Sequence, residues 1–337
     1  MPGPLRPQFS KPYRIPGFML PGTSPGLRAS NHVMTSRAKR IAIGLSVALL
    51  LASWAMTLDG FFVSPDILRR TDQERGEAVA GAYGATLENV SIRASDGATL
   101  KGWLFTPQNY HGRAVLLVHA GVGNRREMLG HAEWLLTRGY ACLLVDQRGC
   151  GTSGGRISWG VNEPADISAW AVWLRDRTHA SAVFGCGVSR GSTTLLQSLA
   201  LKAPFTALAL EATGAGNIAQ PYKFISDKMG ISERRARMTW WPLIEPSFWW
   251  IRLRYGFDMK SAQDGVAAIR GSQVAVLLIH GSEDQGAALA GAERLRDANP
   301  QRTDLVVIRG ANHEWFSEDR PEIMIRLLAW FDAHAKS

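Results

Sequence analysis

The sequence Gly187-Val188-Ser189-Arg190-Gly191 stands between two stretches of different character. Residues 182–186 before it are apolar and small, as in a fully buried strand, and residues 192–201 after it place leucines at helical spacing. A serine at this junction lies on a sharp turn between a strand and a helix. The flanking glycines remove the side chains that would collide with that turn. This pattern is typical of a nucleophile elbow, although the pentapeptide alone also fits an ordinary glycine-rich turn, so the rest of the chain decides.

Short apolar runs alternate with helical patterns on both sides of this turn. The predicted strands comprise residues 87–93, 99–105, 114–119, 141–146, 182–186, 207–210, 274–280 and 304–308. The predicted helices comprise residues 128–138, 163–175, 192–201, 287–298 and 321–334. The turn Asp96-Gly97 joins the first two strands as an antiparallel hairpin. Strands that alternate with helices at this spacing predict a parallel sheet covered on both faces, the α/β class.

The alternation breaks at about residues 212–261, which we interpret as a cap inserted into the domain. This insert gathers tryptophans among arginines, which favours a surface at a membrane interface. Two other roles fit the same composition. The cap could line a pocket for an acyl or aromatic group, or its helices could simply pack around a small core of their own.

The net charge of +9 is concentrated in the N-terminal tail, since residues 1–40 carry seven basic side chains and no acidic one. The remaining chain is nearly balanced, so no groove for nucleic acid is expected. The tail is rich in Pro, Gly and Arg and is predicted to be disordered. The three cysteines show neither metal spacing nor a disulfide framework and are interpreted as small core residues.

An uncharged run, Ile41–Leu58, follows the basic cluster at the end of the tail. Its length lies between that of a signal-peptide core and the roughly 20 residues that span a bilayer. We therefore predict a transmembrane anchor or signal segment at 41–63 and a connector at 64–86. The basic flank predicts a cytoplasmic N-terminus and an exported domain. The alternatives are a cleaved signal with secretion, a buried soluble helix, and translation from Met34.

A serine needs a base within hydrogen-bond reach and a carboxylate that orients the base. In an open parallel sheet these groups come from loops beyond the carboxyl ends of strands. His313 follows the last predicted strand, and Asp284 follows the strand before it, in the order Ser, acid, His. We predict Ser189, Asp284 and His313 as catalytic, with Glu211 and Glu283 as the alternative acids.

Backbone N–H groups are expected to stabilise the developing oxyanion. One is predicted to come from Arg190, directly after the serine. The other is predicted to come from Gly121, with Ala120 as the alternative, in the loop after the strand that ends at His119. No cofactor and no metal are expected.

From about Leu87 to its end the chain resembles the α/β-hydrolase superfamily of serine hydrolases. It is similar to the bacterial membrane-linked or exported proteins described as alpha/beta hydrolases or serine aminopeptidase-like proteins. The segments that carry this resemblance are LLVHAG (116–121), GYACLLVDQRGCGTSGG (139–155), the helix start at 163–166, GVSRG (187–191), RYGFD (254–258), LLIHGSED (277–284) and GANH (310–313). The resemblance implies an eight-stranded, mostly parallel sheet, the triad Ser189, Asp284 and His313, and a cap after the strand that ends near Glu211.

Three positions depart from the family pattern. Ala120 stands where a glycine usually follows the histidine, Arg190 replaces a small or apolar residue, and Gln285-Gly286 replaces the usual Val-Pro. None of these changes removes a catalytic side chain.

Together these features predict a hydrolase domain at 87–337 that cleaves a carboxylic ester or thioester through an acyl-enzyme. The alternatives are an amide or peptide hydrolase and a non-catalytic, membrane-anchored binding protein. The expected partners are a small-molecule or lipid-like acyl substrate and the membrane, with neither nucleic acid nor an obligate protein partner.

Overall fold

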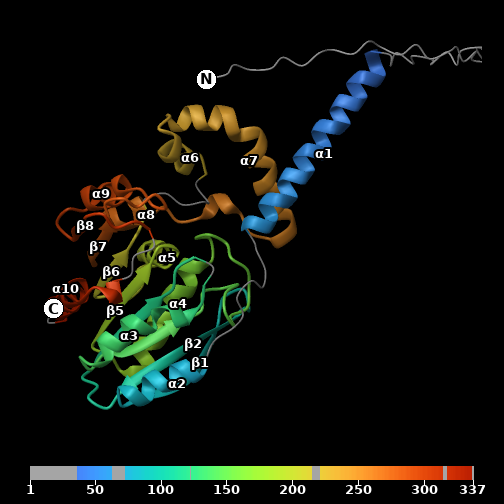
Figure 1. Ribbon diagram of the computed structural model, residues 1–337. Coiled ribbons are helices and arrows are strands. Elements are labelled where there is room, and N and C mark those ends of the chain that lie inside the picture. The colour runs from blue at the N-terminus through green and yellow to red at the C-terminus, as the bar shows by residue number, and fades with distance from the viewer. Residues whose placement is uncertain (1–35, 63–72, 122, 215–220, 314–316, 336–337) are drawn as a thin grey trace, which may run out of the picture. The chain divides into compact units, whose positions relative to one another are not determined.

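Each strand predicted from the sequence is present, and all of them join one sheet (Figure 1). The computed structural model describes residues 36–62, 73–121, 123–214, 221–313 and 317–335. The strands are β1 (Ala85–Arg93), β2 (Thr99–Pro107), β3 (Arg113–Val118), β4 (Ala141–Val145), β5 (Ala182–Val188), β6 (Ala207–Glu211), β7 (Ala275–Gly281) and β8 (Thr303–Ile308). Their order across the sheet is β1-β2-β4-β3-β5-β6-β7-β8.

The sheet is parallel except at one edge. β1 pairs antiparallel with β2, and β2 pairs antiparallel with β4. All later neighbours, from β4-β3 to β7-β8, are parallel. The predicted hairpin turn is closed by the Gly97 N–H, which donates to the Ala94 carbonyl at 2.9 Å. The predicted eight-stranded, mostly parallel sheet is therefore confirmed.

Helices cover both faces of this sheet, as the alternating pattern predicted. One face packs against α2 (Gln73–Ala82), α3 (Leu129–Leu136) and α10 (Pro321–His334). The other packs against α4 (Glu163–Thr178), α5 (Arg190–Ser198), α8 (Gly265–Arg270) and α9 (Leu289–Ala298). Short 3-10 turns are η1 (Arg125–Met128), η2 (Leu199–Leu201), η3 (Met259–Ser261) and η4 (Ser317–Asp319). The sequence did not predict α8, because its six residues are too few to show a helical period.

The central strands are buried on both faces. Every residue of β4, β5, β6 and β7 is buried, which explains why these strands read as continuous apolar runs rather than alternating ones. Cys142 and Cys186 lie in this core, and Cys150 is buried in a loop. None of the three forms a disulfide, which fits the prediction that they serve as small core residues.

The insert forms a helical cap made of α6 (Pro221–Met229), α7 (Glu233–Tyr255) and η3, gold to orange in Figure 1. It has a small core of its own, whose buried members are Tyr222, Ala236, Ile244, Phe248, Ile251 and Met259. This confirms the third predicted role, a cap that packs around its own core. Trp241 and Trp249 lie outside that core and are 55% and 65% exposed. An acyl pocket and contact with a bilayer stay predictions.

The predicted apolar segment lies within α1 (Ser36–Phe62). Chain contacts divide the protein into two units, Met1–Val47 and Ala48–Ser337, and the sheet, its helices and the cap belong to the second. Within the described residues, no helix has the length and apolar character that a membrane crossing requires. The predicted transmembrane helix is therefore not supported. The other predicted boundaries stay predictions, and the predicted disordered tail lies outside the described residues up to residue 35.

Candidate active site

Ser189 occupies a strained turn between β5 and α5. Its backbone angles, φ 51° and ψ −112°, are rare for a residue with a side chain. A hydrogen bond stabilises this backbone conformation, since the Ser189 N–H donates to the Glu211 carbonyl at 2.8 Å. The two glycines of the motif are sterically required. A Cβ at Gly191 would lie 2.2 Å from the Val118 carbonyl oxygen, and one at Gly187 would lie 2.8 Å from the Gly191 backbone. The turn thus has the predicted nucleophile-elbow geometry.

The histidine and the carboxylate predicted from the sequence lie in one hydrogen-bonded chain with this serine. His313 Nε2 is 2.9 Å from Ser189 Oγ. On the other side of the ring, His313 Nδ1 is 2.9 Å from Asp284 Oδ1 and 2.8 Å from Oδ2. An ionised carboxylate only accepts, so Nδ1 carries the proton and Nε2 presents its lone pair to the serine hydroxyl. This tautomer is the one a general base requires.

The loop after β7 holds Asp284 in place. The Ala287 N–H donates to Asp284 Oδ1 at 2.7 Å, and the carboxylate is fully buried while the His313 side chain is one-third exposed. His280 Nε2 lies 3.5 Å from Asp284 Oδ2 and 2.8 Å from the Ala287 carbonyl oxygen. Burial excludes water from the carboxylate and so strengthens its interaction with the imidazole.

Gly286, one of the departures from the family pattern, makes room for the imidazole. A Cβ at this position would lie 2.5 Å from His313 Cγ and 2.7 Å from Nδ1. Real Cβ atoms essentially never approach so closely. A glycine here therefore allows the His313 ring to sit against the backbone of the acid loop.

Neither alternative acid contacts His313. The buried Glu211 carboxylate accepts instead from His131 Nε2 at 2.9 Å and from Ser317 Oγ at 2.6 Å. Glu283 is exposed. Of the three candidate acids, Asp284 is the one that the fold brings to the imidazole.

The two predicted oxyanion donors are the N–H groups of Arg190 and Gly121. Neither N–H has an acceptor among the described residues. Ala120 was the alternative, but its backbone donates to the Glu127 carboxylate. This leaves Gly121 as the better second donor. Its φ of +40° is a conformation that favours glycine.

His119, which directly follows β3, orients the loop that carries Gly121. His119 Nε2 accepts from the Gln147 N–H at 3.1 Å, so Nδ1 carries the proton and donates to the Ala120 carbonyl at 2.8 Å. Burial, with the positive charge of Arg190 nearby, lowers the pKa of His119 to about 4. The imidazole is therefore neutral at pH 7, and this tautomer is fixed.

A second Ser-His-carboxylate cluster lies under the elbow, and the sequence did not reveal it. His131 of α3, Glu211 of β6 and Ser317 of η4 bond to one another within 2.9 Å, and all three are fully or almost fully buried. Side chains that are so buried and bonded to one another fit a structural role. His131 and Glu211 also lie with Cys186 in the one group of potential metal ligands found among the described residues, with all ligand atoms within 4.8 Å. The carboxylate and imidazole are already bonded to each other.

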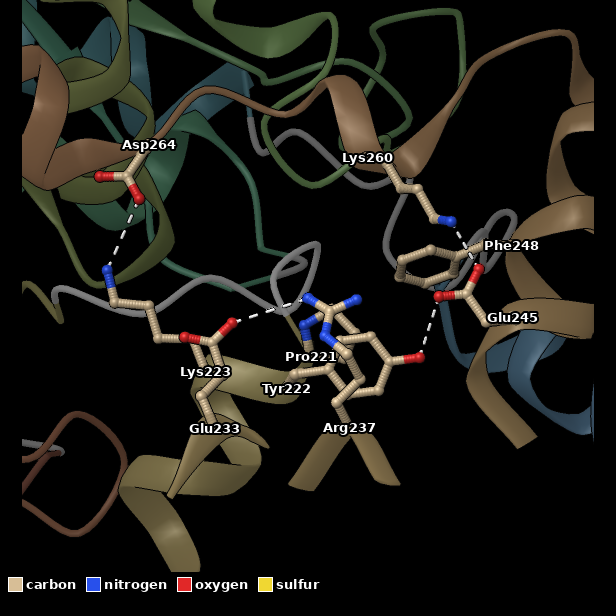
Figure 2. Close-up of a pocket in the computed structure, with 9 residues that line it drawn as sticks. All are labelled: Pro221, Tyr222, Lys223, Glu233, Arg237, Glu245, Phe248, Lys260 and Asp264. Carbon is tan, nitrogen blue, oxygen red and sulfur yellow. Dashed lines mark hydrogen bonds and ion pairs between the residues drawn. The ribbon is translucent and has the colours of Figure 1, made fainter. Parts of the chain in front are cut away.

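The cap contains a cavity of about 460 Å³ (Figure 2). Its polar lining is paired internally, as the dashed lines in Figure 2 show: Lys223 with Asp264 at 3.5 Å, Arg237 with Glu233, and Lys260 with Glu245. Tyr222 donates to Glu245 at 3.0 Å, and burial raises its pKa to about 12. The Arg237 guanidinium covers the Tyr222 ring at 4.4 Å. These contacts hold α6 against α7.

A mostly parallel eight-stranded sheet, an elbow serine after β5 and a Ser-His-Asp chain at the strand ends define an α/β-hydrolase architecture. The family comparison agrees, since the model of the alpha/beta hydrolase family matches residues 115–327. The chain therefore belongs to the alpha/beta hydrolase family.

Among solved structures, the esterase Pf2001 of Pyrococcus furiosus is similar, with a TM-score of 0.60 and 19% identity over 81% of this chain and 98% of that one. The alpha/beta hydrolase GrgF from Penicillium sp. sh18 has a TM-score of 0.56 and 17% identity over 75% and 100%. The dipeptidyl peptidase 4 of Porphyromonas gingivalis has a TM-score of 0.54 and 20% identity over 74% and 35%. At these identities the likeness concerns the fold.

One curated relative shares a short segment. The polyketide transferase ATR5 of Stachybotrys chlorohalonatus (strain IBT 40285) is 38% identical over 71 residues, which is 21% of this chain. The match spans about a quarter of the relative's length (24%).

Proposed function

We propose that this protein is a serine hydrolase that cleaves carboxylic esters or thioesters through an acyl-enzyme. The observation that carries the proposal is the chain Ser189–His313–Asp284, in which every link is 2.8–2.9 Å and the tautomer suits a general base. Membership of the alpha/beta hydrolase family supports it. The strain at Ser189 supports it too, because such backbone outliers cluster at functional sites.

In the proposed acylation step, Ser189 Oγ attacks the substrate carbonyl carbon while His313 Nε2 takes the hydroxyl proton. Asp284 remains ionised and stabilises the imidazolium that forms. The carbonyl oxygen becomes an oxyanion between the N–H groups of Arg190 and Gly121. His313 then gives the proton to the leaving alcohol or thiol, and the acyl group stays on Ser189.

In the proposed deacylation step, a water replaces the leaving group and His313 takes a proton from it. The resulting hydroxide attacks the acyl carbon, the oxyanion forms again at the same two donors, and the acid product leaves as the proton returns to Ser189.

Esters and thioesters are the proposed class because their leaving groups depart more readily than amines, so the Ser-His-Asp chain suffices without further leaving-group assistance. A panel of p-nitrophenyl esters of rising acyl length, run beside matched anilides, tests both parts. Faster turnover of the anilides would change the assignment to an amide hydrolase.

Labelling with a fluorophosphonate probe tests the proposal against a non-catalytic binding protein. Purified full-length protein should label covalently, and Ser189→Ala should not. Ser91→Ala serves as a matched control, because Ser91 is an exposed serine of the edge strand β1 and has no part in the proposed chemistry. An unlabelled wild-type protein, or equal labelling of Ser189→Ala, would refute the hydrolase.

A further inference from the structure

Arg190 is an unusual neighbour for a candidate nucleophile, because it places a charged side chain inside the protein. The residue begins α5 directly after Ser189, and only 8% of its surface is exposed. Charged side chains are almost never buried unless they are paired and hydrogen-bonded. The contacts of this guanidinium therefore indicate why the chain keeps it.

The guanidinium joins two loops and the start of α4. Its Nε donates to the Gly121 carbonyl in the loop after β3. Its Nη2 donates to Cys150 Sγ at 3.1 Å in the loop after β4. Its Nη1 lies 3.9 Å from Glu163 Oε1 at the start of α4. The same side chain that follows Ser189 thus holds the loop with the second predicted oxyanion donor.

Glu163 supplies the opposite charge, and its carboxylate is held in a fixed position by hydrogen bonds. Its carboxylate accepts from Ser158 N and Oγ at 2.6 Å each and from the Gly160 N–H at 2.9 Å, and it is 1% exposed. An anion held by so many donors is fixed in position. Trp159 lies under the guanidinium, with its ring 5.7 Å from the Arg190 carbon centre. Glu163 therefore balances the charge of the guanidinium, and the Trp159 ring helps to orient it.

Two constraints then determine where the Gly121 N–H points. A peptide unit is planar, with its C=O and N–H in opposite directions. The His119 imidazole holds the carbonyl of the Ala120–Gly121 unit at 2.8 Å, and Arg190 holds the carbonyl of the next unit. With both neighbouring planes fixed, the φ of +40° at Gly121 is fixed too, and the N–H keeps one direction.

We propose that Arg190 is a positioning residue that sets the second oxyanion donor through the Gly121 carbonyl. This inference rests on the proposed hydrolase function. It also links two departures from the family pattern. Ala120 stands in place of a glycine, and the loop that contains it is held by Arg190, which stands in place of a small residue. Arg190 thus contributes its own N–H to the oxyanion and aligns the other one.

The test compares Arg190→Met and Arg190→Lys with the wild-type full-length protein. Arg190→Met removes every donor, and Arg190→Lys places a carbon where the arginine Nε bonds the Gly121 carbonyl. Both should label with fluorophosphonate at least about 10-fold more slowly, because loss of one oxyanion donor costs about 100- to 1000-fold. The lysine variant keeps the charge and guards against a loss of folding. Melting temperatures are measured beside the rates.

A matched ester and thionoester distinguish misplacement of the oxyanion donor from a general loss of active structure. The thiono sulfur is a poor hydrogen-bond acceptor, so its cleavage draws little on the oxyanion donors. The ester kcat should fall at least about 10-fold more than the thionoester kcat in both Arg190 variants. Arg148→Met is the matched control, because Arg148 is also buried but pairs with Asp166 at 2.6 Å, so its substitution should lower both rates alike.

Equal losses on the two substrates in the Arg190 variants, or wild-type rates in Arg190→Lys, would overturn the positioning role. Either result leaves the hydrolase itself intact. The proposed hydrolase fails separately, if the wild-type protein does not label at all.

Discussion

Gly286→Ala should inactivate the enzyme without unfolding it, because the added methyl group meets the imidazole of His313. The new Cβ would lie 2.5 Å from His313 Cγ and 2.7 Å from Cδ2 and Nδ1, where ordinary contacts are 3.4–4 Å. The ring must therefore withdraw by about 1 Å. His313 then cannot keep both its 2.9 Å contact with Ser189 and its 2.8 Å contact with Asp284.

A displacement of about 1 Å at a reacting group costs about 100-fold in rate. We therefore expect kcat to fall about 100-fold, which corresponds to about 2.7 kcal/mol in activation free energy. Folding should be little affected, because Gly286 is exposed and its φ is outside the left-handed region. The melting temperature should stay within a few degrees of the wild type.

The assay measures p-nitrophenyl ester turnover and fluorophosphonate labelling together with thermal unfolding. Gly271→Ala is the control, since Gly271 is also an exposed loop glycine, has a φ of −89° and has nothing within 4 Å of an added Cβ. This control should keep wild-type activity. A Gly286→Ala variant with at least half of the wild-type rate would refute the packing of His313 against this loop.

Four further outcomes are expected. Asp284→Asn should lower kcat by about 10,000-fold, because the wrong tautomer of His313 then faces Ser189. Glu283→Gln should leave kcat unchanged. An active Asp284→Asn protein would refute the assignment of the acid. Glu211→Ala removes the partner of the buried His131 and should lower the free energy of unfolding by about 3 kcal/mol in denaturant titrations, with wild-type stability contradicting this role. The pKa of His119 is about 4 in the folded protein, whereas the histidine of the unfolded chain protonates near pH 6.5. Below pH 6.5 the unfolded chain therefore binds a proton that the folded protein does not, and the free energy of unfolding falls as the pH drops. Above pH 6.5 the neutral His119 costs no stability. The free energy of unfolding should fall by about 2 kcal/mol between pH 7 and pH 4.5, and His119→Gln should reduce this dependence on pH. Export of the domain stays a prediction, tested by a C-terminal reporter that should be active only outside the cytoplasm.

The sequence predicted those parts of the fold that repeat a local pattern. The central strands are buried on both faces, so each appears as an apolar run bounded by turn residues, and their alternation with helices determines the sheet. The site followed from chain order and strand ends, because parallel strands bring their carboxyl-end loops together. That rule alone predicts Asp284 and His313.

Other features depend on contacts that no local pattern records. Glu211 and Ser317 are 106 residues apart, and nothing near either residue indicates their bond. Arg190 stood out as an unusual residue, but its role depends on loops that begin 69 residues before it, at Gly121. Gly286 looked like a departure from the family pattern until the position of the His313 ring explained it. In each case tertiary packing, rather than propensity, decides the function of the residue.

In the proposed mechanism Ser189 carries the acyl group during turnover. Rapid acid quench of full-length protein with a slowly hydrolysed ester, followed by peptide mass spectrometry, measures this directly. We predict the acyl mass on the peptide that contains Ser189 and its absence in Ser189→Ala. Turnover with the acyl group on another residue, or with no acylated peptide under conditions of a kinetic burst, would contradict the account.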